Sequence, residues 1–219
     1  TGLGIGADQR EVTTFDLLSG ERSLRDVAKA TAVPRLHVAP STLDLLGIET
    51  ELASAQDRAY RLKTAIAAHH GRGPRFDYIL VDCPPSLNLL TLNALAAADS
   101  VLVPLQTEFF ALEGLTQLLS TIEQVRGSLN KQLELQGIVL TMVDSRNRLT
   151  RQVEEDVRET MGDAVYKTVI PRNVRISEAP SFGKPVLLYD MNCTGSQAYL
   201  QLAAEVIKRE KNTLAAQAA

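Results

Sequence analysis

The sequence has no tryptophan, only 5% aromatic residues and only two cysteines among its 219 residues. Cys83 and Cys193 lie far apart and match no metal-ligand spacing, so we interpret both as the reduced thiols of a cytoplasmic protein. No stretch approaches the roughly 18 consecutive apolar residues that cross a bilayer. A formal net charge of −3 excludes a globally basic nucleic-acid coat protein but leaves room for a local basic patch.

The sequence also lacks the spacing of a phosphate-binding P-loop, G-x-x-x-x-G-K-[ST]. The glycines of residues 1–6 do not replace it, because no strand precedes them and no lysine follows them. We predict an ordinary loop there. The first residue is Thr1 rather than methionine, so we expect the sequence to be a fragment or a processed chain.

What the sequence does contain is an alternation of short apolar runs with longer segments of helical period. This alternation predicts an α/β fold with a doubly wound, mostly parallel sheet. With 45% hydrophobic residues the chain is long enough for one sizeable core, so we predict a single domain over residues 1–219 with a frayed tail at 212–219. The predicted strands are residues 36–39, 78–81, 101–105, 137–142 and 165–170. The middle three are apolar at consecutive positions, as strands covered on both faces require.

Two apolar stripes of helical period lie between the later strands, at residues 112–125 and 149–161. The last helix is predicted to begin at the capping-box spacing of residues 194–197. Its inward residues are predicted to be Tyr199, Leu202, Val206 and Ile207. Ser23 and Asp26 have the same spacing and are predicted to cap a short helix.

The strongest local signal is the stretch FDYILVDCPPS at residues 76–86. An apolar run ends at Asp82, and a rigid turn formed by Pro84 and Pro85 follows. Ligands of open α/β sheets bind beyond the carboxyl ends of the strands. We therefore predict that Asp82 holds a water of a Mg²⁺ shell beside a nucleotide phosphate. The alternative is that Asp82 only caps the helix that follows.

Two basic clusters also follow predicted strands. They are Arg146, Arg148 and Arg151 in the first cluster, and Arg172, Arg175 and Lys184 in the second. Taken singly, each is an ordinary solvated surface charge. Loops that follow parallel strands emerge at one edge of the sheet, so the two clusters together favour a shared anion-binding role.

These stretches resemble motifs of the ParA/Soj family of bacterial chromosome and plasmid partition ATPases. The matching residues run in order along nearly the whole chain: 1–5 (TGLGI), 82–86 (DCPPS), 91–95 (TLNAL), 108–114 (EFFALEG), 141–144 (TMVD) and 170–181 (IPRNVRISEAPS). The last stretch is the most specific. The resemblance implies a P-loop NTPase fold of the deviant-Walker, MinD/ParA-like type.

The resemblance also implies an activity. Family members are ATP hydrolases that bind ATP and Mg²⁺ between the two subunits of a homodimer. The dimer coats DNA without sequence preference, and a centromere-binding partner of the ParB/Spo0J type stimulates hydrolysis and releases it. A member of this family is expected to be cytoplasmic and associated with the nucleoid.

Site residues follow from the resemblance by position. Asp82 matches the catalytic acidic residue that is linked to Mg²⁺ through water. The second switch is matched by Pro84, Pro85 and Ser86. The residues that hold the adenine are matched by Met142, Pro171 and Asn173, and the positions that contact DNA phosphates by Arg146 and Arg175.

The sequence departs from the family pattern at its start. In the family a strand, a Lys-Gly-Gly-Val-Gly-Lys-Thr loop, a helix and a second strand come before the point at which these residues begin. We therefore expect roughly 40–50 preceding residues. The alternative hypothesis is a truncated paralogue that binds DNA or a partner without hydrolysing ATP. We expect no stable membrane anchor, since residues 210–219 contain one leucine and no aromatic residue.

Overall fold

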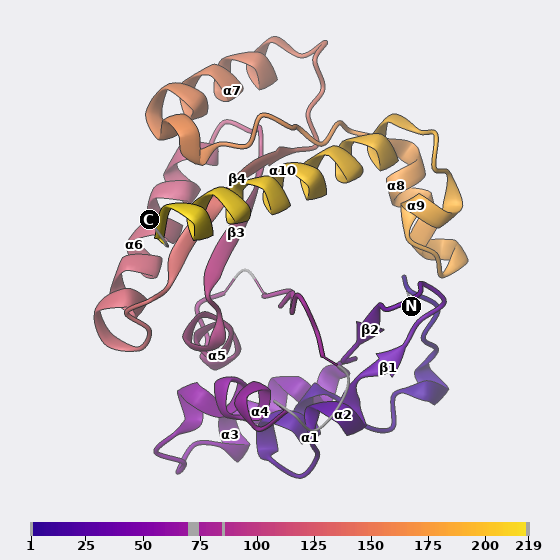
Figure 1. Ribbon diagram of the computed structural model, residues 1–219, viewed down its shortest axis with the longest axis vertical. Coiled ribbons are helices and arrows are strands. Elements are labelled where there is room, and N and C mark those ends of the chain that lie inside the picture. Colours follow the sequence, from indigo (N-terminus) through magenta and orange to yellow (C-terminus); the bar gives the residue numbers. More distant parts are fainter. Residues whose placement is uncertain (1, 70–74, 85, 218–219) are drawn as a thin grey trace. The chain divides into compact units, whose positions relative to one another are not determined.

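The computed structural model describes residues 2–69, 75–84 and 86–217, and its internal contacts divide the chain into two compact units (Figure 1). Unit 1 comprises residues 3–100 and 122–134, and unit 2 comprises Gly2 with residues 101–121 and 135–219. The prediction of a single domain over residues 1–219 stays a prediction. The glycines and proline of residues 69–75 predict a turn between a helix and the next strand, and this turn lies mostly outside the described residues.

Unit 1 contains short helices, one small hairpin and the last part of the longer helix α6 (Ala111–Ser128). Its α-helices are α1 (Thr14–Ser19), α2 (Leu24–Val27), α3 (Ile48–Glu51), α4 (Arg61–His69) and α5 (Leu89–Ala97). Its 3₁₀ turns are η1 (Ala7–Gln9), η2 (Leu43–Gly47) and η3 (Arg58–Tyr60). The first predicted strand appears as β2 (His37–Val38), which pairs antiparallel with β1 (Lys29–Ala30). The predicted cap of α2 is confirmed, because Ser23 and Asp26 bond to each other's backbone N–H groups.

Apolar clusters join the short helices of unit 1. In one cluster α4 packs on α1 and α2 through Leu17, Leu24 and Val27, and in the other α1 packs on α3 through Leu18, Ile48 and Leu52. The buried side chain of Asn93 joins α5 to the start of α4, since its oxygen accepts from Leu62 N–H (3.1 Å) and its nitrogen donates to the Arg58 carbonyl (2.8 Å). Unit 1 also buries apolar side chains of α5 and of residues 122–134, among them Leu95, Ile122 and Leu133.

The strand predicted at residues 78–81 is wrong. These residues have no β-ladder in the part of the chain that the structure describes, and their apolar side chains are exposed, Leu80 to 89%. A strand is stable only where a neighbour satisfies its N–H and C=O groups. The apolar run alone therefore did not suffice to make this segment a strand.

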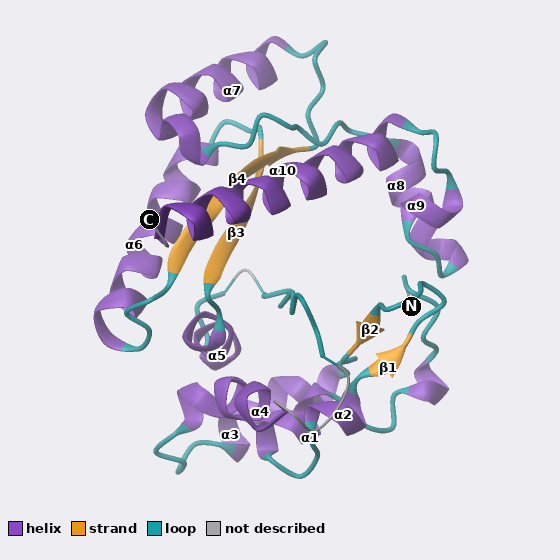
Figure 2. Cartoon of the chain, in the orientation of Figure 1, coloured by secondary structure: helices purple, strands orange, loops and turns teal. Residues whose placement is uncertain are grey.

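Unit 2 contains the larger sheet. Strands β3 (Ser100–Gln106) and β4 (Glu134–Thr141) are neighbours and run in the same direction (Figure 2). Residues 165–171 continue this arrangement on β4 through two parallel bridges, Ile138 to Val165 and Val143 to Pro171. The predicted strands at 101–105 and 137–142 are confirmed, and with them the α/β class with a parallel sheet.

The segment at 165–170 pairs with β4 only at its ends, and the reason is local. The N–H groups of Lys167 and Thr168 donate to the two carboxylate oxygens of Glu205, at 2.9 and 3.0 Å. The Tyr166 carbonyl accepts from Arg158 (3.1 Å). These backbone groups are turned away from the ladder, so the predicted strand is reduced to two bridges.

Helices cover both faces of β4. On one face Ile138 and Leu140 pack with α6 (Ala111–Ser128) and α7 (Arg148–Met161). On the other face Val139 packs with α10 (Thr194–Gln217) through Ala198 and Leu202. The expectation that β3 is covered on both faces is wrong, because Leu102 and Pro104 are exposed while Val103 is buried.

The remaining elements of unit 2 are η4 (Gly162–Ala164), α8 (Val174–Glu178), η5 (Ala179–Phe182) and α9 (Val186–Tyr189). α10 begins at Thr194, so Thr194 is not its cap; the Cys193 sulfur accepts from Ser196 N–H instead (3.4 Å). Leu202 is buried as predicted, but Tyr199 and Ile207 are about 40% exposed. α10 extends to Gln217, further than expected. Among the described helices none has the length and apolarity to span a membrane.

Candidate functional site

The end of β4 and the end of the segment 165–171 lie side by side. Val143 N–H donates to the Ile170 carbonyl (3.1 Å), and Arg172 N–H donates to the Val143 carbonyl (3.0 Å). This register sets Met142 and Pro171 on adjacent chain ends, as expected for loops that follow neighbouring parallel strands. Two of the three residues predicted to hold the adenine therefore share one edge of the sheet.

Met142 has an unusual backbone. Its φ angle is +56°, in the left-handed region that disfavours a side chain, and it directly follows the last residue of β4. Its side chain is 42% exposed. Strained residues of this kind are retained where the surroundings fix them, often at binding sites. The conformation redirects the chain immediately before Val143 pairs with Pro171.

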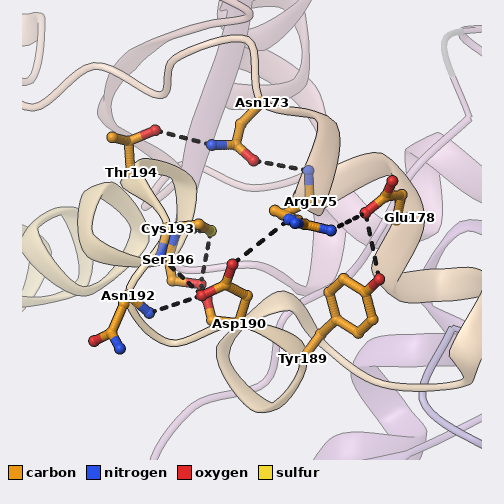
Figure 3. Close-up of polar contacts among 9 residues, drawn as sticks. All are labelled: Asn173, Arg175, Glu178, Tyr189, Asp190, Asn192, Cys193, Thr194 and Ser196. Carbon is orange, nitrogen blue, oxygen red and sulfur yellow. Dashed lines mark hydrogen bonds and ion pairs between the residues drawn. The ribbon is translucent and has the colours of Figure 1, made fainter.

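The third predicted adenine residue, Asn173, is the N-cap of α8. Its side-chain oxygen accepts from Arg175 N–H (2.8 Å), and its side-chain nitrogen donates to Thr194 Oγ1 (2.9 Å). Figure 3 shows this bridge from α8 to the first residue of α10. Both polar groups of the side chain are thus engaged, so Asn173 fixes the loop between Pro171 and Arg175.

Arg146 lies just beyond the end of β4 in a two-point contact with Asp144. Its Nε and Nη2 donate to the two Asp144 oxygens at 3.0 and 2.9 Å. The hydrogen bonds from Arg146 hold the pKa of Asp144 well below its usual range, at about 2, and the charge of Arg172 contributes. The Arg146 side chain is itself 88% exposed. The arginine therefore lies in water, whereas the Asp144 side chain is only 29% exposed.

Arg175 lies between two carboxylates, as Figure 3 shows. It donates to Glu178 at 2.9 Å and lies 3.6 Å from Asp190. Tyr189 donates its hydroxyl to the same Glu178 oxygen (3.3 Å). The Glu178 hydrogen bond, foremost, raises the pKa of Arg175, so the guanidinium keeps its charge. Half of the Arg175 side chain is exposed.

The acidic partners of these arginines were missed in the sequence. Glu178 stands three residues after Arg175 in a predicted polar stretch, a spacing that joins side chains on a helix. Asp144 stands two residues before Arg146, and this closeness was a usable signal. Asp190 belongs to a separate turn before α10, so no spacing in the sequence indicated its contact.

Asp82 lies in unit 1, in the segment that precedes α5. Its side chain is exposed, and it has no hydrogen bond or ion pair among the contacts of the described residues. The following loop is anchored further along, because Thr91 Oγ1 donates to the Ser86 carbonyl (2.6 Å) and Asn88 caps α5. Pro84 belongs to the same exposed segment, whereas Pro85 lies outside the described residues.

Cys83, the neighbour of Asp82, lies in an environment that disfavours a reactive thiolate. Partial desolvation raises the pKa of the Cys83 thiol, and the negative charge of Asp82 raises it further. The thiol hydrogen bonds to the Val81 carbonyl (3.6 Å). A protonated thiol is a poor nucleophile.

Asp82 suits Mg²⁺ only together with other ligands of the ion. Within the described ranges, no three His, Cys, Asp or Glu side chains gather into a metal-ligand group. Mg²⁺ normally keeps several waters and takes one or two carboxylates together with substrate phosphates. A single exposed carboxylate therefore suits a water-mediated contact to nucleotide-bound Mg²⁺ and does not suit a metal site of its own.

Comparison with known proteins gives consistent matches. A family model described as an AAA domain matches residues 1–135. The chain is 62% identical over 212 residues to the chromosome partitioning protein ParA of Caulobacter vibrioides. The aligned residues cover 97% of this chain and 79% of that protein. It is 50% identical over 206 residues to the sporulation initiation inhibitor protein Soj of Bacillus subtilis, covering 94% and 80% of the two chains. Its structure is similar to cobyrinic acid a,c-diamide synthase of Mycobacterium smegmatis with bound ADP and magnesium, with a TM-score of 0.71 and 36% identity over 83% of this chain and 73% of that one.

Proposed function

Because the chain belongs to the ParA/Soj family of chromosome-partitioning ATPases, with its P-loop NTPase fold, we propose that it is an ATP-dependent switch in DNA segregation. In this function two copies join when ATP and Mg²⁺ bind, and the homodimer then binds DNA without sequence preference. A centromere-binding partner of the ParB/Spo0J type stimulates hydrolysis and releases the DNA. The protein acts in the cytoplasm, on the nucleoid.

One observation carries the DNA-binding part of the proposal. Arg146 follows β4, Arg175 follows the segment 165–171, and these two chain ends are joined by the bridge between Val143 and Pro171. The two arginines are therefore presented from adjacent chain ends and are half or more exposed. Exposed guanidinium groups bind phosphate oxygens through two parallel N–H groups. Such contacts position a protein on DNA but read no sequence.

The nucleotide part rests on two groups of residues. Met142 and Pro171 present apolar surface at adjacent chain ends, and Asn173 fixes the loop beside them, so these three are proposed to hold the adenine. Asp82 is proposed to hold a water of the Mg²⁺ shell, with Pro84, Pro85 and Ser86 as the second switch. When bound, Mg²⁺ neutralises charge on the phosphates. Asp82 contributes by orienting that water.

Dimer formation explains how ATP controls DNA binding in this proposal. One subunit offers few phosphate contacts, so its affinity for DNA is low at physiological salt. Two joined subunits present twice as many, and the second set binds at a high effective concentration. ATP then strengthens DNA binding through assembly alone.

The test is a DNA titration of the full-length protein with ATP at two salt concentrations. Arg146→Ala and Arg175→Ala should each weaken binding to all sequences alike and reduce the salt slope by about one ion. The control matched to Arg175→Ala is Arg126→Ala, because Arg126 on α6 forms a salt bridge of the same i,i+3 spacing, with Glu123 at 2.7 Å. ATP binding should be unchanged in all three variants.

Unchanged DNA affinity in the double variant Arg146→Ala/Arg175→Ala would refute this DNA surface and leave both arginines as ordinary surface ion pairs. DNA binding without any measurable ATP hydrolysis, with or without the partner, would instead favour the alternative of a non-hydrolysing paralogue.

A further inference from the structure

Both arginines of the proposed DNA surface are already held by carboxylates. Arg146 makes a two-point contact with Asp144, at 3.0 and 2.9 Å. Arg175 contacts Glu178 at 2.9 Å and Asp190 at 3.6 Å. Three acidic side chains thus face the two groups that would receive phosphate.

The geometry of these contacts is the geometry that a phosphate would use. The Nε and Nη2 atoms of Arg146 donate in parallel to two oxygens of one anion, which is how guanidinium groups bind phosphates. The Arg146 side chain is 88% exposed and that of Arg175 is 52% exposed. Ion pairs in water are weak and exchange readily. A phosphate can therefore take the place of the carboxylate.

The carboxylates on Arg175 have other contacts that keep them in place. Glu178 also accepts the hydroxyl of Tyr189 (3.3 Å). Asp190 also accepts the N–H groups of Asn192 and Cys193, both at 3.1 Å, in the turn that begins α10 (Figure 3). If Arg175 moves to a phosphate, these anions stay behind beside it. They therefore remain available to bind Arg175 again in place of the phosphate.

We propose that Asp144, Glu178 and Asp190 compete with DNA phosphates for Arg146 and Arg175, and that they thereby set the affinity of the DNA surface. The inference rests on the proposed DNA-binding function of the two arginines. It gives the acidic residues a role of their own, which is to keep the affinity of a single subunit for DNA low. Two joined subunits then bind DNA because their added contacts overcome this competition.

An opposite role is the physical alternative. Carboxylates can instead hold the arginines in the orientation that phosphate needs, and their removal would then weaken binding. The two roles predict changes of opposite sign. Substitution by the isosteric amide distinguishes them, because Gln and Asn keep an oxygen acceptor for the Tyr189 hydroxyl and for the backbone N–H groups but lose the charge.

The experiment is a DNA titration of the full-length protein with ATP, using a fluorescent duplex of arbitrary sequence. Glu178→Gln should tighten binding by about threefold, because the phosphate then no longer has to displace the exposed ion pair between Arg175 and Glu178. Asp144→Asn should tighten binding as well, through Arg146. The control is Glu155→Gln, which removes the same charge from an exposed position on α7 and should leave affinity unchanged.

The decisive step combines Glu178→Gln with Arg175→Ala. Competition requires the arginine, so the tightening should disappear in the double variant. Weaker or unchanged binding in both Glu178→Gln and Asp144→Asn overturns the inference, and so does tightening that persists without Arg175. If Arg175→Ala alone leaves DNA affinity unchanged, the proposed function of that arginine has failed instead. The two failures are thus distinguishable.

Discussion

Glu205 of α10 is expected to determine the stability of unit 2, and its replacement by alanine is a sharp test. Its carboxylate accepts the N–H groups of Lys167 and Thr168, at 2.9 and 3.0 Å, where the chain leaves the ladder of β4. It also pairs with Arg209 (3.2 Å), one turn further along α10. The same segment leads directly to Pro171 and the candidate site.

The magnitude follows from the burial and the number of partners. The Glu205 side chain is only 19% exposed, and hydrogen bonds to a charged group contribute about 1.5–3 kcal/mol each. Lys167 is exposed, so water replaces part of the loss at its N–H group. We expect Glu205→Ala to lower the free energy of unfolding by about 3 kcal/mol. For a chain of this length that corresponds to a fall in Tm of about 6–12 °C.

The pH dependence has a definite sign. Burial raises the pKa of Glu205, but the N–H donors of Lys167 and Thr168, together with Arg209, outweigh burial and leave the pKa below its ordinary value. A lowered pKa in the folded state stabilises the protein above the unfolded pKa of about 4.3. The stabilisation is lost as the pH falls from there through the folded pKa. The Tm difference between wild type and Glu205→Ala should therefore shrink in acid.

The assay is thermal unfolding followed by circular dichroism between pH 7 and pH 3. Glu205→Gln keeps one acceptor oxygen and should lose about half as much stability. Glu155→Ala, at an exposed position of α7, is the matched control and should change stability by less than about 0.5 kcal/mol. A Glu205→Ala protein as stable as this control would refute the reasoning.

Two further predictions concern the candidate nucleotide site. Asp82→Ala should abolish ATP hydrolysis in a phosphate-release assay while the circular dichroism spectrum stays unchanged, since the side chain is exposed; Cys83→Ser should keep activity, and the reverse pattern would show that the site is misplaced. Met142→Gly should be at least as stable as wild type in urea unfolding, because glycine accepts the left-handed φ of +56°, whereas Met142→Val should lose about 1 kcal/mol or more. A marked loss of stability in the glycine variant would contradict the inference that the backbone of Met142 is strained.

Much of unit 2 could be predicted from the sequence because its signals are local and strong. The apolar runs at 101–105 and 137–142 became β3 and β4. The stripes at 112–125 and 149–161 became α6 and α7, which bury Leu115 and Val157 against the sheet. In each case the period of the apolar residues matches the element that buries them. The adjacency of Met142 and Pro171 then follows from the parallel order of the chain.

The two missed strands share a different cause, since each depends on partners that are distant in sequence. The run at 78–81 has the composition of a strand, but a strand needs a neighbour, and none pairs with it in the described part of the chain. The run at 165–170 is interrupted by Glu205, more than 30 residues away. Periodicity cannot reveal that a carboxylate on a later helix takes two N–H groups from a ladder.

The arginines illustrate why a site cannot be identified from charge alone. Arg209 is only 27% exposed, donates to the carbonyls of Asp163 and Val165, and lies 4.0 Å over the ring of Tyr166. Its charge is committed to the fold, and a phosphate would have to replace several contacts at once to capture it. Arg146 is 88% exposed and bonds to one carboxylate, that of Asp144, at the protein surface. An arginine with many buried partners, such as Arg209, is therefore structural. An arginine such as Arg146 is available to a ligand, because the ligand has to replace only one weak ion pair.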